Sequence, residues 1–218
     1  METVDSSGEI APCVRIVDDD AAVRISLARV LRAAGFCVCT YPTAQAFLEA
    51  DSQTVPGCVI LDLALPGQSG LDLQEALAKG DWPLPVIFLS GRGDVPSSVQ
   101  AMKAGAVDFL VKPPDAGALV AVVQTALERD RAARAEREEI ASVTRRLAGL
   151  TPRERAVLER LVLGEPNKQI AAVLGVSEKT VKVHRANVLL KMAARSIASL
   201  VRMTERAGRR PAETKPSA

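Results

Sequence analysis

Three consecutive aspartates, Asp18, Asp19 and Asp20, directly follow the apolar run CVRIV. Asp20 precedes an amphipathic segment and is expected to cap a helix, because an Asp side chain accepts hydrogen bonds from the first backbone N–H groups. Asp18 and Asp19 remain as adjacent carboxylates at the end of a predicted buried strand. Because like charges repel, this pair indicates a cation site.

Three more polar side chains end predicted strands: Asp62, Ser90 and Lys112. Parallel strands deliver such side chains to one edge of a sheet, where three carboxylates suit a hard cation such as Mg²⁺. Asp62 stands alone at the end of the central strand, so we predict that it is a nucleophile toward a phosphoryl group. A hydroxyl and an ammonium group nearby suit the oxygens of that phosphoryl group.

The first half of the chain alternates short apolar runs with segments of helical periodicity. The predicted strands are residues 13–17, 37–41, 58–62, 86–90 and 108–112, and the predicted helices are 20–34, 43–50, 70–79, 95–104 and a last one from Asp115. Such a series predicts an α/β fold with a five-stranded, doubly wound parallel sheet. Its ligands bind at the carboxyl ends of the strands.

The last of these helices continues without Gly or Pro from Ala118 to Ala148, and its apolar face thins after Leu127. We interpret this stretch as a solvated linker helix, with a partner helix or dimer contact as the alternative. An all-α domain of four helices follows. It contains a capping box at 151–154, helices capped by Asn167 and Ser177 around a turn at Gly175, and a final helix at 196–208.

These patterns divide the chain into a first domain at 12–127, a helical linker at 128–147 and a helix-turn-helix domain at 148–208. Residues 1–11 and 209–218 are expected to be disordered tails. The formal net charge of +2 hides an asymmetry, since residues 1–125 carry 15 acidic and 8 basic side chains and residues 126–218 carry 11 and 20. The basic half therefore predicts a polyanionic partner.

The composition also indicates the cellular compartment in which the protein is expected to act. No apolar run reaches the roughly 18–20 residues that span a bilayer, so no membrane association is expected. The polar N-terminal stretch is not expected to act as a signal peptide. The four cysteines, Cys13, Cys37, Cys39 and Cys58, have no metal-binding spacing and lie in apolar, strand-like context. We interpret them as small buried hydrophobic residues in a reducing cytoplasm.

The motifs IVDDD, VILDLALPGQSGLDL, VIFLSGRGDVPSSVQAMKAGAVDFLVKP and TPRERAVLERL, with NKQIAAVLGVSEKTVKVHRANVLLKM after them, resemble bacterial two-component response regulators of the NarL/FixJ subfamily, on the FixJ side. The resemblance covers residues 12–205 and implies a flavodoxin-like receiver and a LuxR-type DNA-binding domain. It implies Asp62 as the phosphoacceptor, charged by a sensor histidine kinase. The only catalysis implied is that of the receiver's own phosphorylation and dephosphorylation.

The resemblance also implies roles for the neighbouring residues. Mg²⁺ would be held by Asp19, Asp62 and the Ala64 carbonyl, with Asp18 assisting through water. Ser90 and Phe109 would form the switch pair, and Lys112 would contact the phosphoryl group before a cis peptide to Pro113. Ser90 stands where Thr is common, which preserves the hydroxyl. Because Pro114 follows Pro113, where another residue is more usual, the first residue of the next helix is not predicted.

In the second half, the resemblance places the recognition helix within residues 176–192, after the Ser177 cap, with promoter DNA as the ligand. The residues implied at bases or phosphates are Lys179, Thr180, Lys182, Val183, Arg185 and Asn187. The last helix would provide a homodimer contact through Ile197, Leu200 and Val201, favoured by phosphorylation. RNA polymerase is expected as a further partner at the promoter. His184 is expected to pack or to contact the DNA backbone, and Lys191 to meet phosphate or solvent.

Two alternatives come from other classes of protein. A Mg²⁺-dependent phosphohydrolase with an aspartyl nucleophile usually carries a second Asp two residues later, where this chain has Ala64. A phosphorylation-independent adaptor would normally have lost Asp62 or Lys112, and both are present.

Overall fold

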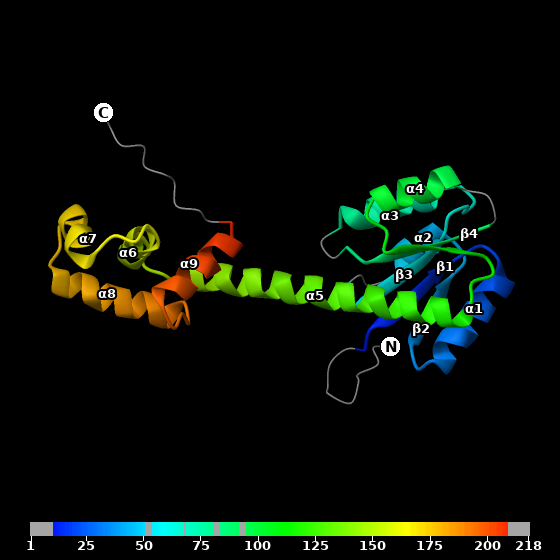
Figure 1. Cartoon of the computed structure of the whole chain (residues 1–218), viewed down its shortest axis with the longest axis horizontal. Helices are drawn as coiled ribbons and strands as arrows, with labels where there is room; N and C mark the ends of the chain where they lie inside the picture. Colours follow the sequence, from blue (N-terminus) through cyan, green and yellow to red (C-terminus); the bar gives the residue numbers. More distant parts are fainter. Residues whose placement is uncertain (1–10, 51–53, 68, 81–82, 92–94, 209–218) are drawn as a thin grey trace. The chain divides into compact units, whose positions relative to one another are not determined.

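A computed structural model describes residues 11–50, 54–67, 69–80, 83–91 and 95–208. The chain divides into two compact units, Met1–Ala133 and Arg134–Ala218. One continuous helix, α5 (Ala116–Ala148), runs across the division (Figure 1). The expected tails lie almost entirely outside the described residues.

The first unit contains the predicted five-stranded sheet. Its strands are β1 (Cys13–Val17), β2 (Cys37–Tyr41), β3 (Gly57–Asp62), β4 (Val86–Ser90) and β5 (Asp108–Val111), all parallel, in the order β2-β1-β3-β4-β5. The strands β1, β3 and β4 are buried at every position, as their unbroken apolar sequences predict. The order reverses between β1 and β3, which is where this architecture opens a crevice at the strand ends.

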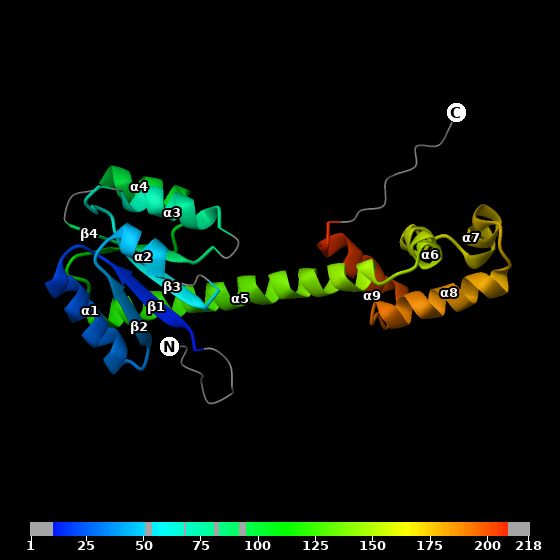
Figure 2. The same cartoon turned by 180° about the vertical axis from the view of Figure 1, so that it is seen from behind.

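Helices cover both faces of the sheet (Figure 2). On one face, α1 (Ala21–Ala33) and α5 pack Leu31 and Val123 against Ile16 and Ile60. On the other face lie α2 (Ala44–Ala50), α3 (Gly70–Ala78) and α4 (Val95–Lys103), which bury Phe47, Leu73 and Ala101 against Leu61 and Phe88. The sheet is thus closed on both sides and accessible mainly at its ends.

Local signals at the site are confirmed in part. The Asp20 carboxylate caps α1 by accepting hydrogen bonds from the N–H groups of Ala22 and Val23. The Lys112–Pro113 peptide is cis. However, β5 ends one residue earlier than predicted, at Val111. Lys112 still donates its N–H to the Ser90 carbonyl at 2.7 Å, and Pro113 has no N–H with which to continue the strand.

The second unit is helical, with α6 (Pro152–Val162), α7 (Asn167–Leu174), α8 (Glu178–Lys191) and α9 (Ile197–Arg206). The end of α5 belongs to its core, because Val143 and Leu147 pack with Leu158, Val188 and Met192. Val143 and Leu147 therefore belong to a folded core, although both lie in the stretch that was expected to be a solvated linker.

The cap of α7 differs from prediction. Asn167 is the first helical residue, and the N-cap position belongs to Pro166, which offers no side-chain hydrogen bond. The caps at Thr151 and Ser177 are confirmed, and α7 ends at Gly175 in the left-handed conformation with φ 65°. That turn leads into α8 and completes the helix-turn-helix. None of the helices in the described ranges is long and apolar enough to cross a membrane.

Candidate functional site

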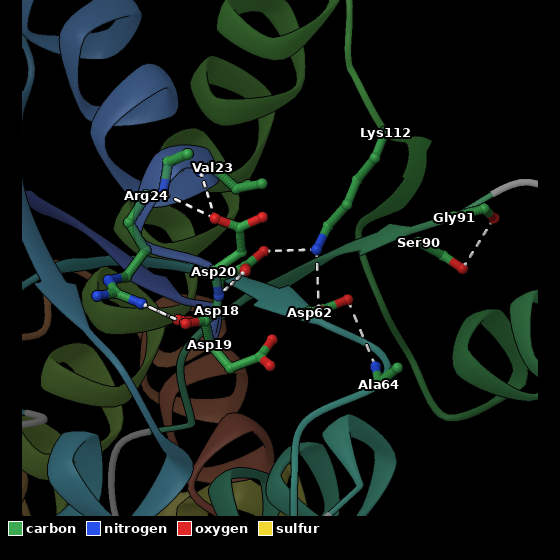
Figure 3. A network of polar contacts seen from close by, with 11 residues as sticks. Asp18, Asp19, Asp20, Val23, Arg24, Asp62, Ala64, Ser90, Gly91 and Lys112 are labelled. Carbon is green, nitrogen blue, oxygen red and sulfur yellow. Dashed lines mark hydrogen bonds and ion pairs between the residues drawn. The ribbon is translucent and has the colours of Figure 1, made fainter.

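The carboxyl ends of β1, β3 and β5 bring the predicted polar side chains together (Figure 3). Asp18 follows β1 and is fully buried, and Asp62 ends β3 with 6% of its surface exposed. Lys112 extends from the end of β5 into the space between them. Its Nζ lies 2.6 Å from Asp18 Oδ2 and 2.9 Å from Asp62 Oδ2. The Lys112 ammonium thus compensates part of the negative charge of the cluster.

The protonation of Lys112 follows from these contacts. Burial alone lowers the pKa of a lysine, because it disfavours the charged form. Here the hydrogen bonds and charges of Asp18 and Asp62 outweigh burial, so the pKa of Lys112 is raised above its ordinary value. The site therefore holds a lysine that stays cationic at neutral pH.

The carboxylates of Asp18, Asp19 and Asp62 each offer an oxygen, and these oxygens all lie within 4.8 Å of one another. Two of the carboxylates are buried, while Asp19 is exposed. Asp18 Oδ2 is fully buried and pairs with the Lys112 ammonium at 2.6 Å. One ammonium group leaves net negative charge among three carboxylates. An oxygen set of this kind fits a small divalent cation such as Mg²⁺.

Two residues that were not predicted from the sequence position the backbone around the acidic cluster. Arg24, in the first turn of α1, donates from Nη1 to the carbonyl oxygens of Asp18 at 2.7 Å and Asp19 at 3.0 Å. Gly70 begins α3 so close to β3 that a Cβ there would lie 2.5 Å from the Asp62 carbonyl oxygen. The sequence offers only a weak signal for either residue, namely a basic residue near a helix start and a Gly in a predicted helix.

The remaining expected site residues surround this centre. The Ala64 N–H donates to Asp62 Oδ1 at 3.4 Å. The Ser90 hydroxyl is buried and donates to the Gly91 carbonyl at 3.1 Å. Phe109 is half-buried and lines an open groove of about 530 Å³ between α4 and β5. Ser90 thus ends β4, and Phe109 lies on β5 at the wall of that groove.

In the second unit, α8 carries the residues expected at DNA. Val181 and Val188 face the core, while Lys179, Lys182, Val183 and Asn187 are exposed. Thr180 is half-buried, and its hydroxyl lies 2.9 Å from the Ser177 hydroxyl. Arg185 is also half-buried and donates to Asn167 Oδ1 at 3.5 Å. The exposed face of α8 thus presents ammonium groups, an amide and one apolar side chain.

The structure revises one expectation for the second unit and adds detail to two others. Leu200 is fully buried in the core with Leu158 and Met192, so it does not lie on a surface that a second copy could contact. Its neighbours Ile197 and Val201 are half-buried. Lys191 is exposed to solvent, as expected, and its Nζ also pairs with Glu154 Oε2 at 2.7 Å. His184 is half-buried, with an Nδ1 that accepts or donates no hydrogen bond.

Comparison with known proteins finds two family matches, one in each half of the chain. Residues 14–124 match the response regulator receiver domain, and residues 148–204 match the LuxR family of bacterial regulatory proteins. The chain therefore belongs to the response regulators that join a receiver to a LuxR-type DNA-binding domain, and it is a transcription regulator of that class.

Within that class, the chain is similar to FixJ. It is 46% identical to the transcriptional regulatory protein FixJ of Azorhizobium caulinodans over 92% of this chain and 95% of the relative. Nodulation protein W of Bradyrhizobium diazoefficiens is 44% identical, covering 89% and 86%. Among solved structures, response regulator StyR is 42% identical, with a TM-score of 0.81 over 90% of this chain and 99% of that chain. Full-length FixJ from B. japonicum is 41% identical, with a TM-score of 0.55 over 90% and 97%.

Proposed function

We propose that a sensor histidine kinase switches this transcription regulator in the cytoplasm by transferring a phosphoryl group to Asp62. The phosphorylated chain then dimerises and binds promoter DNA through α8, where RNA polymerase is a further partner. The observation that carries the proposal is the pairing of Lys112 Nζ with both Asp18 and Asp62 at the switch point of the sheet.

The chemistry assigns a separate task to each side chain. A carboxylate oxygen of Asp62 attacks the phosphorus of a phosphohistidine, forming an O–P bond while the P–N bond breaks and the electron pair returns to the imidazole. Lys112 neutralises charge that gathers on the phosphoryl oxygens. Asp18, buried and paired with Lys112, orients that ammonium.

A divalent cation completes the site. Asp19, Asp62 and the Ala64 carbonyl would hold Mg²⁺, with Asp18 reached through water. When bound, the ion neutralises carboxylates and phosphoryl oxygens that would otherwise repel one another. Arg24 fixes the backbone that carries Asp18 and Asp19, which keeps the acidic ligands in place.

The switch would run through Ser90 and Phe109. In the phosphorylated chain the Ser90 hydroxyl exchanges its bond to the Gly91 carbonyl for a phosphoryl oxygen. Phe109 then turns into the space that this movement leaves, which alters the groove between α4 and β5. Such a change biases an equilibrium that already exists between two forms of the receiver.

Labelling with acetyl phosphate tests the phosphoryl acceptor. With Mg²⁺, the wild-type chain should gain base-labile phosphate, and Asp62→Asn should abolish it. Asp19→Asn should lose most of the Mg²⁺ dependence, because one ligand charge is removed. Glu75→Gln, which alters an exposed carboxylate of α3, is the matched control and should be labelled as wild type. Equal incorporation by Asp62→Asn would reject the assignment.

Titration against DNA tests the recognition helix. Lys182 lies in the second turn of α8 and is exposed, so Lys182→Ala should cost specific binding about 1–3 kcal/mol and relax one base position. Glu159→Gln, on the exposed side of α6, serves as the control. If Lys182→Ala weakens operator and scrambled DNA equally, the orientation of α8 in the groove is wrong.

The two alternatives receive no such support. The side chain at Ala64 supplies no acid or base for a phosphohydrolase. An adaptor that ignores phosphorylation has no use for a half-buried Lys112 held between two aspartates, an arrangement that costs desolvation free energy.

A further inference from the structure

Three of the four cysteines lie on one face of the sheet, away from the acidic cluster. Cys13 opens β1, and its register partner on β2 is Cys37, with Cys39 two residues further along. Because paired residues share a face and alternate residues of a strand do so too, all three side chains leave the sheet on the same side. Val17 and Tyr41, further along that face, pack in the core with α2 and α3.

The side chains of Cys13 and Cys39 turn toward each other. Their Sγ atoms lie 3.1 Å apart, whereas a disulfide needs about 2.05 Å. The sulfurs must therefore approach by roughly 1 Å, a movement that rotation about both Cα–Cβ bonds can provide with a small shift of the strand. β2 is an edge strand, hydrogen-bonded to the sheet through β1 alone, so it is the part of the sheet that can shift.

The two thiols differ in access. Cys13 is buried with 6% of its surface exposed, while Cys39 is half-exposed at the edge. Burial and the adjacent Cys39 sulfur raise the pKa of the Cys13 thiol well above its usual range. Cys39 is thus the thiol that an external reagent reaches first, and Cys13 is placed to attack afterwards.

We propose that Cys13 and Cys39 are a redox-modification site that forms a reversible intramolecular disulfide with a small disulfide such as oxidised glutathione. The Cys39 thiolate attacks one sulfur of the small disulfide and expels its other half as a thiolate. Cys13 then loses its proton to solvent, attacks Cys39 Sγ and releases the second half as a thiolate. Two protein thiols are oxidised, and one small disulfide is reduced to two thiols.

The diagonal placement across the two strands makes this bond reducible. Cys39 pairs in register with Arg15 rather than with Cys13, so the cross-link must deviate from relaxed geometry. Deviation of this kind stores strain and favours reduction, as in regulatory rather than structural disulfides. Such a bond suits a compartment in which disulfides are transient.

Differential alkylation of the full-length chain tests this inference. The reduced protein is incubated under native conditions with excess oxidised glutathione, then alkylated, digested and mapped by mass spectrometry. We expect a Cys13–Cys39 cross-link, loss of two of the four alkylatable thiols and full recovery with dithiothreitol. Because the map is made on the wild-type chain, it does not depend on whether any variant folds.

Two variants sharpen the result. Cys39→Ser should lose the cross-link, while Cys37→Ser, which removes the other thiol of β2, should keep it. A cross-link through Cys37, a glutathione adduct on Cys39 that Cys13 never resolves, or four unchanged thiols would each overturn the proposal. Phosphorylation of Asp62 plays no part in this test, so its failure would leave the proposed function unaffected.

Discussion

At the scale of single residues, the least conspicuous member of the site is Gly70. A side chain at this position would meet the Asp62 carbonyl oxygen at 2.5 Å and the Phe88 ring at 3.0 Å. Both neighbours are fixed, one by the backbone of β3 and the other by the buried core. The start of α3 can approach β3 only because residue 70 lacks a Cβ.

Gly70→Ala should therefore move the end of β3 and with it the Asp62 carboxylate. We expect at least a tenfold loss in the rate of acetyl phosphate labelling, with about 1–3 kcal/mol lower stability from overpacking. Gly149→Ala is the control, since a Cβ there makes only ordinary contacts, at 3.4 and 3.9 Å, outside the receiver. Wild-type labelling by Gly70→Ala would show that the loop yields without disturbing Asp62.

Glu154 is a buried carboxylate whose main partner, Lys191, lies 37 residues away in the sequence. Its Oε2 accepts from Lys191 Nζ at 2.7 Å and from the Thr151 N–H at 2.8 Å. These contacts, with Lys191 the stronger, lower the pKa of Glu154 from 4.5 to about 2. Because the carboxyl binds its proton less readily in the folded chain, its contribution is present above the ordinary pKa and is lost as the pH falls toward 2.

Glu154→Gln should accordingly destabilise the second unit at neutral pH, and the difference from wild type should shrink between about pH 5 and pH 2. Lys191→Ala should follow the same profile, because it removes the other half of the pair. Urea unfolding at a series of pH values measures both, with Glu159→Gln as the control on the same helix. A difference that stays constant with pH would contradict the pairing.

At the scale of elements, α5 is bound to the receiver sheet by a buried polar contact. Asp130, with 2% of its surface exposed, accepts at Oδ2 from the Gly57 N–H at 2.8 Å. Arg15 is buried nearby at the same end of the sheet and donates to the carbonyl oxygens of Cys13 and Val55. The charged residues and the sparse apolar face of residues 128–147 predict a helix exposed to solvent. Asp130 is instead buried against the receiver sheet.

Asp130→Ala should cost the first unit about 1–3 kcal/mol, because the buried Gly57 N–H loses its acceptor. Asp130→Asn, which retains an acceptor oxygen, should be less damaging. Denaturant unfolding followed on the receiver, with exposed Glu128→Ala as control, measures the effect. Equal stability of Asp130→Ala and Glu128→Ala would mean that this contact does not anchor α5.

At the scale of the whole molecule, phosphorylation must change how copies associate. The unphosphorylated chain should sediment near its monomer mass of 23.1 kDa at micromolar concentration. Acetyl phosphate with Mg²⁺ should raise the average mass toward twice that value, since it shifts an existing equilibrium. Asp62→Asn should not respond. An unchanged mass for the phosphorylated wild type would contradict the proposal that phosphorylation causes dimerisation.

The sequence by itself determined the βα alternation, the helix-turn-helix and the meeting of Asp18, Asp62 and Lys112. It could do so because each is a local pattern or a strand end, and parallel strands bring their ends to a common edge. Of the site, Arg24 and Gly70 escaped prediction, because a loop's backbone contacts leave little trace in residue type.

Only the tertiary structure decided which helix faces meet. Periodicity marks the apolar side of a helix but not its neighbour, so it could not place Leu200 in the core or Val143 and Leu147 beside α6 and α8. The same holds for Glu154 with Lys191, and for Asp130 with Gly57, which are 37 and 73 residues apart in the sequence. These residues do not lie at the ends of parallel strands, so only the packing of the elements decides that they meet.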